Sequence, residues 1–391
     1  MESSILKKIS EEFSTPAFVF DTDTFASRAD SIKKALGENI PLCFSIKANP
    51  FLLTSLPDSI DHVEVCSPGE LTICERLHIA PDMIIYSGVN KGTDDIERAI
   101  RCHAGILTAE SLLHVTLINE AAIRLGEKVN LILRLSNGNQ FGMDKGDIIE
   151  VIDHQDRYPG LSIAGLHYYT GTQKKKADLV TKDIAAFENF IRILEQEHGF
   201  HPIHIEYGPG IAAEYFNPPY EEKDEAMLAE AAAALRDFAS RYPVTVEMGR
   251  FLASSCGTYL TAVADLKITE GTHYVICDGG MNHLKYYGQT MAMQVPPITV
   301  LGKDGSETDY TLCGSLCTTA DLLVRKVTLP ALALGDVLAF HRCGAYTVTE
   351  GIGLFLSRTL PRILLYSQEK GVRLVRDFYP TDLLNTPEME V

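Results

Sequence analysis

Short apolar segments recur along the first 250 residues of the chain, separated by longer segments of helical period. The apolar segments span residues 41–46, 62–67, 83–88, 105–110, 130–136, 162–169, 204–210 and 244–250. Segments between them, such as TKDIAAFENFIRILEQEHG, repeat apolar side chains every three or four positions, as an amphipathic helix does. Near-continuous apolar strands that alternate with helices predict a parallel sheet covered by helices. Eight such units favour a (β/α)8 barrel over an open, doubly wound sheet.

The pattern changes near residue 255. From there, YLTAVADLKITE, THYVICDGG, DVLAFHRCG and PRILLYSQ indicate strands joined by short turns, with few segments of helical period. TPAFVFDTDTF, close to the N-terminus, is typical of a further strand of the same kind. The sequence therefore predicts an α/β protein in which residues 25–255 form the barrel. Residues 1–24 and 256–391 are expected to form an all-β domain.

The composition narrows the class of protein. Of the 391 residues, 46% are hydrophobic and 22% are charged, which is typical of a soluble globular protein. The formal net charge of −17 argues against a nucleic-acid surface, which needs clustered Lys and Arg. No segment has the length of a transmembrane helix, and MESSILKKISEEF lacks the apolar centre of a signal peptide. We therefore expect neither a nucleic acid nor a membrane as a partner.

The nine cysteines show no regular pairing, which favours a reducing, cytoplasmic location over a disulfide framework. CGSLC, at 313–317, contains the closest pair of cysteines. It lacks a second pair and the spacing of zinc ligands, so no metal site is predicted.

Unusual residues stand at the C-terminal ends of several predicted barrel strands. They are Lys47 in CFSIKANP, Tyr169, Gly208 in the GPG turn, and Glu247 in EMGR. Taken alone, the lysine could be a solvated loop residue, the GPG a plain turn and EMGR a surface ion pair. The catalytic groups of (β/α)8 barrels gather at this face, so their shared position also indicates an active site.

Two further motifs lie in the predicted β-domain, GSLCTTADLL at 314–323 and HRCGAYTVTEG at 341–351. A cysteine among small polar residues is commonly an inert packed thiol, and GAY could be a turn followed by a core tyrosine. Each motif is weak alone, whereas their order along the chain is informative.

The ordered set FSIKANP, VEVCSPGEL, QFGMD, GLHYYTGTQ, YGPGIA, VEMGRFL, CDGGMNH, CTTADLL and GAY resembles the fold-type III, pyridoxal-phosphate-dependent decarboxylases. This is the family of the diaminopimelate and ornithine decarboxylases, and the resemblance covers nearly the whole chain. It implies pyridoxal 5'-phosphate as cofactor. It also implies a homodimer in which the β-domain completes the active site across the dimer.

The resemblance also implies roles for individual residues. Lys47 matches the lysine that holds the cofactor as a Schiff base, and Glu247 matches the acid beside the pyridine nitrogen. Cys317 matches the thiol that supplies a proton across the dimer interface. The phosphate-binding positions correspond to Thr172, Gly208, Gly210, Gly249 and Arg250. Tyr346 matches the tyrosine that reaches the cofactor, and Asp321 lies in the interface loop of Cys317.

The chain departs from the family pattern at several positions. Tyr169 replaces the usual histidine that stacks on the cofactor, and Pro209 replaces the middle glycine of the phosphate loop. The segment DGGMNHLKYYGQT lacks the arginine that grips the distal end of diaminopimelate, and Thr318 stands where a glutamate is usual. Arg250, His283, Thr318 and Asp321 are the predicted substrate contacts.

YTGTQ, DGGMNH, CTT and LPALALGD resemble the butirosin-type decarboxylases, which act on a glutamyl group attached to an acyl carrier protein. A tethered substrate has no free distal end to grip, which agrees with the missing arginine and glutamate. A decarboxylase of a free or carrier-bound amino acid is therefore predicted. Diaminopimelate decarboxylase, an amino-acid racemase and a non-catalytic cofactor-binding homologue remain alternatives, and a racemase would be expected to carry arginine in place of Glu247.

Overall fold

The computed structural model describes residues 1–388. The chain forms two compact units, each with its own core. The β-unit comprises residues 1–27, 214–220 and 252–391, and the barrel unit comprises residues 28–213 and 221–251. Among the described residues, no helix is both long enough and apolar enough to span a lipid bilayer.

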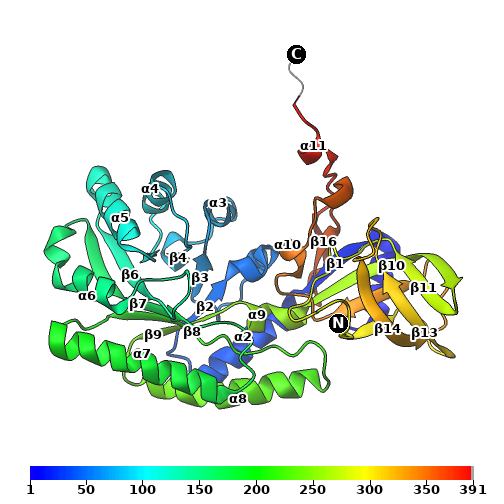
Figure 1. Ribbon diagram of the computed structural model, residues 1–391, viewed down its shortest axis with the longest axis horizontal. Coiled ribbons are helices and arrows are strands. Elements are labelled where there is room, and N and C mark those ends of the chain that lie inside the picture. The colour runs from blue at the N-terminus through cyan, green and yellow to red at the C-terminus, as the bar shows by residue number, and fades with distance from the viewer. Residues whose placement is uncertain (389–391) are drawn as a thin grey trace. The chain divides into compact units, whose positions relative to one another are not determined.

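The barrel unit is built on a closed barrel of eight parallel strands, which confirms the predicted fold (Figure 1). The strands are β2 (Leu42–Ser45), β3 (His62–Val65), β4 (Ile84–Tyr86), β5 (Ile106–Ala109), β6 (Val129–Leu135), β7 (Leu161–Tyr169), β8 (His204–Gly208) and β9 (Val244–Met248). The barrel closes because β2 pairs with β3 on one side and with β9 on the other.

Helices cover the outside of the barrel strands (Figure 1). They are α2 (Thr22–Leu36), α3 (Pro68–Arg76), α4 (Thr93–Arg101), α5 (Leu112–Leu125), α6 (Lys145–Asp153), α7 (Ala177–His198) and α8 (Tyr220–Ala239). Between β2 and β3 the chain forms only 3-10 turns, at Ile46–Ala48 and Pro50–Ser55. One face of each strand meets the helices and the other faces the barrel interior, where Cys43, Ile85, Ile132 and Ala164 pack together.

The β-unit contains a nine-stranded sheet whose main order is β14-β13-β11-β10-β1-β16-β17, with β15 paired to β10 and β12. Its strands are β1 (Ala17–Asp21), β10 (Gly257–Thr269), β11 (Thr272–Cys277), β12 (Ile298–Val300), β13 (Glu307–Cys313), β14 (Leu322–Pro330), β15 (Val337–His341), β16 (Arg362–Ser367) and β17 (Gly371–Arg376). The N-terminal β1 lies between β10 and β16, as the segment TPAFVFDTDTF predicted. The remaining α-helices of the described residues are α1 (Ser3–Phe13), α9 (Arg250–Ala253), α10 (Thr347–Glu350) and α11 (Asp382–Asn385).

The core of the β-unit joins its N-terminal helix to the sheet. Leu6 and Ile9 of α1 are buried against Val19, Leu260 and residues of three other segments. These contacts explain why residues at the two ends of the sequence fold into one unit, because α1 and β1 pack on each other and on Leu260, Leu301, Ala339 and Leu364.

Candidate active site

Lys47 lies at the C-terminal end of the first barrel strand, in a single 3-10 turn whose neighbours Ile46 and Ala48 are fully buried. Its amine is 2.7 Å from the Glu64 carboxylate at the end of β3 and 3.6 Å from the Glu247 carboxylate at the end of β9. The side chain is 38% exposed, so the amine is reachable from the mouth of the barrel. The turn therefore fixes a nucleophilic amine between two carboxylates.

Glu247 is a buried carboxylate with three partners. The Ser45 hydroxyl donates a hydrogen bond to Oε1, and His167 Nε2 lies 3.4 Å from Oε2. Burial alone would raise the pKa of Glu247, but the positive charge of Lys47 and the contacts of His167 and Ser45 outweigh it and hold the pKa well below its usual value. Glu247 is therefore ionised at neutral pH. An ionised carboxylate is the partner that a protonated pyridine nitrogen of a cofactor requires.

Gly208 brings the backbone of β8 against two predicted site residues. A Cβ at this position would lie 2.6 Å from the Tyr169 ring and 3.1 Å from Glu247 Oε2. Burial and the Glu247 charge both raise the pKa of the Tyr169 phenol, so its ring is present as an uncharged aromatic face. Glycine is thus needed to hold Tyr169 and Glu247 at the same point of the barrel mouth.

The loops after β7 and β8 are joined by backbone contacts. Gly210 has a φ of +61°, and a Cβ there would lie 1.8 Å from the Gly171 carbonyl oxygen. The Lys174 N–H donates to the Gly210 carbonyl at 2.9 Å, and the Ala212 N–H donates to the Lys174 carbonyl at 3.0 Å. The predicted position Thr172 lies within this seam, between Gly171 and Lys174.

Gly249 packs on the turn that carries Lys47. A Cβ at Gly249 would lie 3.2 Å from the Cβ atoms of Ser45 and Ala48. The next residue, Arg250, is buried in the barrel unit. The glycines therefore bring backbone close to the Lys47 turn and to Tyr169 and Glu247, which a phosphorylated, aldehyde-bearing cofactor needs for its phosphate and ring. An amine, an ionised buried carboxylate, an aromatic face and glycine-lined loops form a donor set that fits pyridoxal phosphate.

Sequence reasoning missed several ionisable residues of the same mouth. Glu64 pairs with Lys47, and His167 contacts Glu247. Glu206 on β8 is fully buried, and neither of its carboxylate oxygens has a hydrogen-bond partner among the described residues. The available signal was an isolated acid in each of the apolar segments HVEV and HIEY.

A further charged cluster lies at the ends of β5 and β6. Arg134 donates to Glu110 at 3.0 Å; the Glu110 side chain is buried and the Arg134 side chain is half-buried. Lys91, in the loop after β4, donates to the Gly88 carbonyl, and burial lowers the pKa of its amine to about 8. None of these three was predicted as a site residue.

The remaining predicted residues belong to the β-unit. Asp321 accepts the N–H groups of Met281 and Leu316, each at 2.7 Å, so it fixes the DGGMNH segment to the loop that carries Cys317. Cys317 is exposed. Tyr346 has a φ of +67° at the start of α10, which is an unfavourable conformation for a side chain of its size.

His283 lies deeper than a substrate contact requires. One ring nitrogen is 3.0 Å from the Tyr259 hydroxyl and the other is 3.0 Å from the Asn282 amide. Burial lowers the pKa of the imidazole to about 4, so His283 is neutral at physiological pH. Its predicted contact with substrate stays a prediction, because both nitrogens are engaged within the β-unit.

Known proteins identify the family. A family model described as "Pyridoxal-dependent decarboxylase, C-terminal sheet domain" matches residues 18–344. The chain therefore belongs to the pyridoxal-dependent decarboxylases, within the group that includes the ornithine, diaminopimelate and arginine decarboxylases. It is a decarboxylase that uses pyridoxal phosphate, as predicted.

Similar proteins act on more than one substrate. The chain is 25% identical to the L-glutamyl-[BtrI acyl-carrier protein] decarboxylase of Niallia circulans, over 96% of this chain and 94% of that protein. It is 24% identical to the diaminopimelate decarboxylase of Aquifex aeolicus, over 100% and 96%. The crystal structure of diaminopimelate decarboxylase from M. jannaschi superposes with a TM-score of 0.86 at 23% identity, over 98% of this chain and 94% of that chain, and shows the shared fold.

Proposed function

We propose that this enzyme removes the α-carboxylate of an amino acid whose distal end is attached to a carrier, with a glutamyl group on an acyl carrier protein as the favoured substrate. The supporting observation is the charge-balanced segment after DGGM. Tyr286 is buried and donates its hydroxyl to the His341 carbonyl at 2.6 Å. The Lys285 amine lies 3.5 Å from the Glu350 carboxylate. This segment thus offers a distal carboxylate no uncompensated positive charge, and the name of the Niallia circulans relative supports the same substrate class.

In the barrel unit, Lys47 is the group that would bind pyridoxal phosphate covalently, and Glu247 would face the ring nitrogen. The bound cofactor supplies an electron sink for the pair left on the α-carbon when CO2 departs. Glu247 contributes a fixed negative charge that stabilises a proton on the ring nitrogen, because Lys47, His167 and Ser45 hold it ionised. Glu64 accepts a hydrogen bond from the Lys47 amine and so orients it.

The loops of the barrel mouth would hold the rest of the cofactor. Gly208, Gly210 and Gly249 allow backbone to approach a phosphate, and Thr172 and Arg250 would add a hydroxyl and a cation. The Tyr169 ring would cover one face of the cofactor.

Cys317 is proposed as the acid of the reaction. The bond between the α-carbon and its carboxylate breaks, CO2 leaves, and the thiol proton forms the new C–H bond, after which solvent returns a proton to the thiolate. Cys317 is exposed on its own β-unit, which suits donation into the site of a second copy. We therefore propose a homodimer in which Cys317, Thr318 and Tyr346 of the β-unit complete the active site.

The decisive experiment measures CO2 release from glutamyl-carrier thioester, free glutamate and meso-diaminopimelate. The proposal expects turnover of the thioester and little of the two free amino acids. Turnover of meso-diaminopimelate to lysine, with none of the thioester, would instead establish the second candidate function, which the Aquifex aeolicus relative supports. The Lys47→Ala variant is the control for cofactor-dependent CO2 release.

A further inference from the structure

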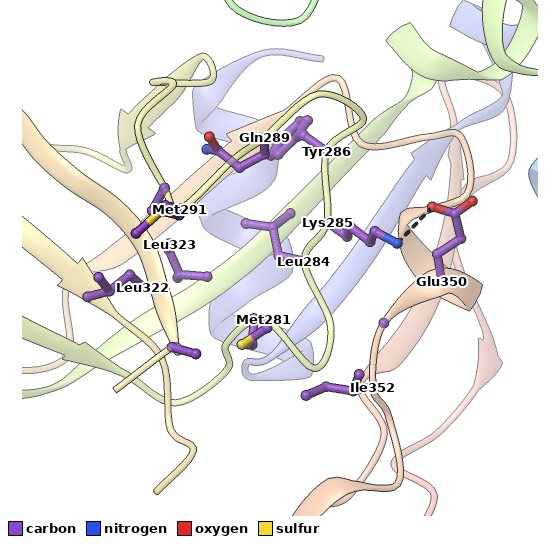
Figure 2. A pocket seen from close by; sticks show the side chains of 13 residues that line it. Met281, Leu284, Lys285, Tyr286, Gln289, Met291, Leu322, Leu323, Glu350 and Ile352 are labelled. Atoms are coloured by element: carbon purple, nitrogen blue, oxygen red, sulfur yellow. Dashed lines mark ion pairs between the residues drawn. The ribbon is translucent and has the colours of Figure 1, made fainter. Parts of the chain in front are cut away.

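A cavity of about 300 Å³ lies within the β-unit, formed by three segments at residues 281–292, 320–323 and 350–352 (Figure 2). Its walls are mainly apolar, and Figure 2 shows Leu284 between the Lys285–Glu350 pair on one side and Leu322 and Leu323 on the other. We call it the methionine pocket, after Met281 and Met291. This volume is at the small end of ligand sites and suits a chain-like group rather than a whole large ligand.

The methionine pocket carries no net charge. Lys285 and Glu350, its charged lining residues, lie 3.5 Å apart and compensate each other. The Gln289 side chain is engaged by the backbone of Gln294, with distances of 2.7 and 2.9 Å, and the Tyr286 hydroxyl is bound to the His341 carbonyl. A charged ligand group would therefore lose hydration without gaining a partner, whereas methylene and methyl groups would not.

The walls of the pocket are held in place independently of any ligand. The Asp321 carboxylate accepts the Met281 N–H, which joins the wall at residues 320–323 to the wall at residues 281–292. Arg325 donates from its backbone to the Ala292 carbonyl and from Nε to the Met291 carbonyl, at 3.0 and 2.8 Å. The cavity is thus preformed, and preorganised walls lower the entropic cost of binding.

The position of the pocket in the sequence links it to substrate. Its first wall, residues 281–292, lies mostly in the DGGMNHLKYYGQT segment, which carries the predicted contact His283, and its second wall begins two residues after Thr318. We propose that the methionine pocket binds the uncharged, chain-like part of the substrate, which for a carrier-bound amino acid is a pantetheine-type arm. This inference rests on the proposed function for the identity of the arm, but its binding test does not depend on decarboxylation.

The chemistry of the pocket distinguishes this occupant from the distal end of a free diamino diacid. A carboxylate or ammonium left unpaired in this cavity would lose its hydration without compensation, whereas methylene groups and methyl groups would gain by burial against Leu284, Leu323 and Met281. Methionine side chains adapt to irregular apolar surfaces, which suits a flexible arm.

The test uses the cofactor-loaded enzyme and pantetheine alone as the probe. Ile352, at the rim, is 46% exposed, so Ile352→Trp fills the opening with little disturbance of the core, and Leu284→Trp fills the centre. The matched control is Ile268→Trp, on an exposed part of β10 outside the pocket. Wild type and Ile268→Trp should bind pantetheine saturably, and each filled variant should bind it at least about tenfold more weakly.

Retained binding in a folded Ile352→Trp variant, or no saturable binding to wild type, would overturn the inference. A change of oligomeric mass in the filled variants with unchanged pantetheine binding would assign the pocket to an interface between copies, and would also overturn it. Failure of the proposed function is separate: pantetheine would bind as described, yet the glutamyl thioester would release no CO2.

If the enzyme turns over the thioester, steady-state kinetics give a second test of the role of the methionine pocket. Ile352→Trp should raise KM for the carrier-bound substrate about tenfold and leave kcat within about twofold, because the pocket binds the arm and not the reacting atoms. An equal loss of kcat for carrier-bound and free amino acids would contradict this role.

Discussion

The Lys47 amine lies 2.7 Å from the Glu64 carboxylate, so the reactive amine of the barrel is held by a residue of the neighbouring strand. Ser45 and Glu64 are direct register partners across β2 and β3, and Lys47 follows Ser45 by two residues. The pairing of the two strands therefore sets the position of the amine, and any substitution that shifts this register would displace it.

Lys47→Ala should abolish both CO2 release and the absorption band of bound pyridoxal phosphate near the visible edge, because no other group is placed to hold the cofactor covalently at this turn. The measurement is an absorption spectrum of the purified holoenzyme. Lys175→Ala, at an exposed lysine, is the control and should keep the band. A normal band in the Lys47 variant would show that another residue holds the cofactor.

Glu247→Gln keeps the shape of the side chain but removes the charge that stabilises a protonated ring nitrogen. We expect kcat to fall about 100-fold or more, as for other preorganised electrostatic groups. Steady-state CO2 release checks this result. Glu75→Gln removes a carboxylate from a partly exposed ion pair with Arg98 and should leave kcat unchanged. Equal kcat in both variants would remove Glu247 from the mechanism.

Glu206→Gln should change the dependence of stability on pH. Burial, followed by the charges of Glu64 and Glu247, raises the pKa of Glu206 well above its ordinary 4.5. Above pH 4.5 the unfolded chain has released this proton while the folded chain keeps it, so the free energy of unfolding falls as pH rises. The variant has no such proton to keep, so its free energy of unfolding does not fall in this way. The difference in the free energy of unfolding between the variant and wild type should therefore grow by at most about 1.4 kcal/mol per pH unit.

Urea unfolding of both proteins at several pH values between about 5 and 8 measures that difference. Glu127→Gln, at an exposed position, should follow wild type throughout. Parallel curves for wild type and Glu206→Gln would mean that Glu206 is ionised in the folded state.

Gly210→Ala should destabilise the protein more than a matched glycine substitution elsewhere. Both Gly210 and Gly126 have positive φ, at +61° and +70°, but only Gly210 meets another atom closely, at 1.8 Å from the Gly171 oxygen. Gly126→Ala should therefore cost about 1–2 kcal/mol from backbone strain alone. Gly210→Ala should cost more and also weaken cofactor affinity, measured by equilibrium titration. Equal losses of stability in Gly210→Ala and Gly126→Ala would show that the loops after β7 and β8 move apart to accept the added Cβ without cost.

Cys317→Ala should lower kcat by about 100-fold or more without changing thermal stability, because the thiol is exposed and is the proposed proton donor.

Mixing the Cys317→Ala variant with the Lys47→Ala variant tests whether two copies share each active site. If each active site takes Lys47 from one copy and Cys317 from the other, mixed dimers recover activity that neither variant shows alone. Absence of recovery in a confirmed mixed dimer would place both residues in the same copy.

The sequence could predict residues whose position along a strand carried the information. Lys47 and Glu247 both follow apolar segments, and parallel strands bring such ends together, so their proximity followed from the fold. Glu64 and Glu206 could not be assigned in this way. In each of these strands a histidine and the acid alternate with apolar residues, so they share one face, but the alternation does not reveal whether that face points into the barrel or towards a helix.

Strand β17 and the contacts of His283 also could not be predicted from the local sequence pattern. The strand β17 was not predicted, because its residues are exposed or half-buried and two are arginines, which weakens the apolar signal. The engagement of His283 by Tyr259 and Asn282 depends on contacts between segments, and no pattern within CDGGMNH indicates it. Site residues could be predicted where the end of a single strand determines their position. They could not be predicted where their position depends on contact between two segments that are distant in the sequence.

The seam between Gly171 and Gly210 restricts how this barrel can change over evolution. A longer residue at Gly210 would meet the carbonyl of the other loop, and an insertion in either loop would break the Lys174 pairing. The two loops can therefore vary only as a pair. Change of substrate is freer in the segments of the β-unit, so members of such a lineage would be expected to diverge there first while the barrel mouth stays nearly constant.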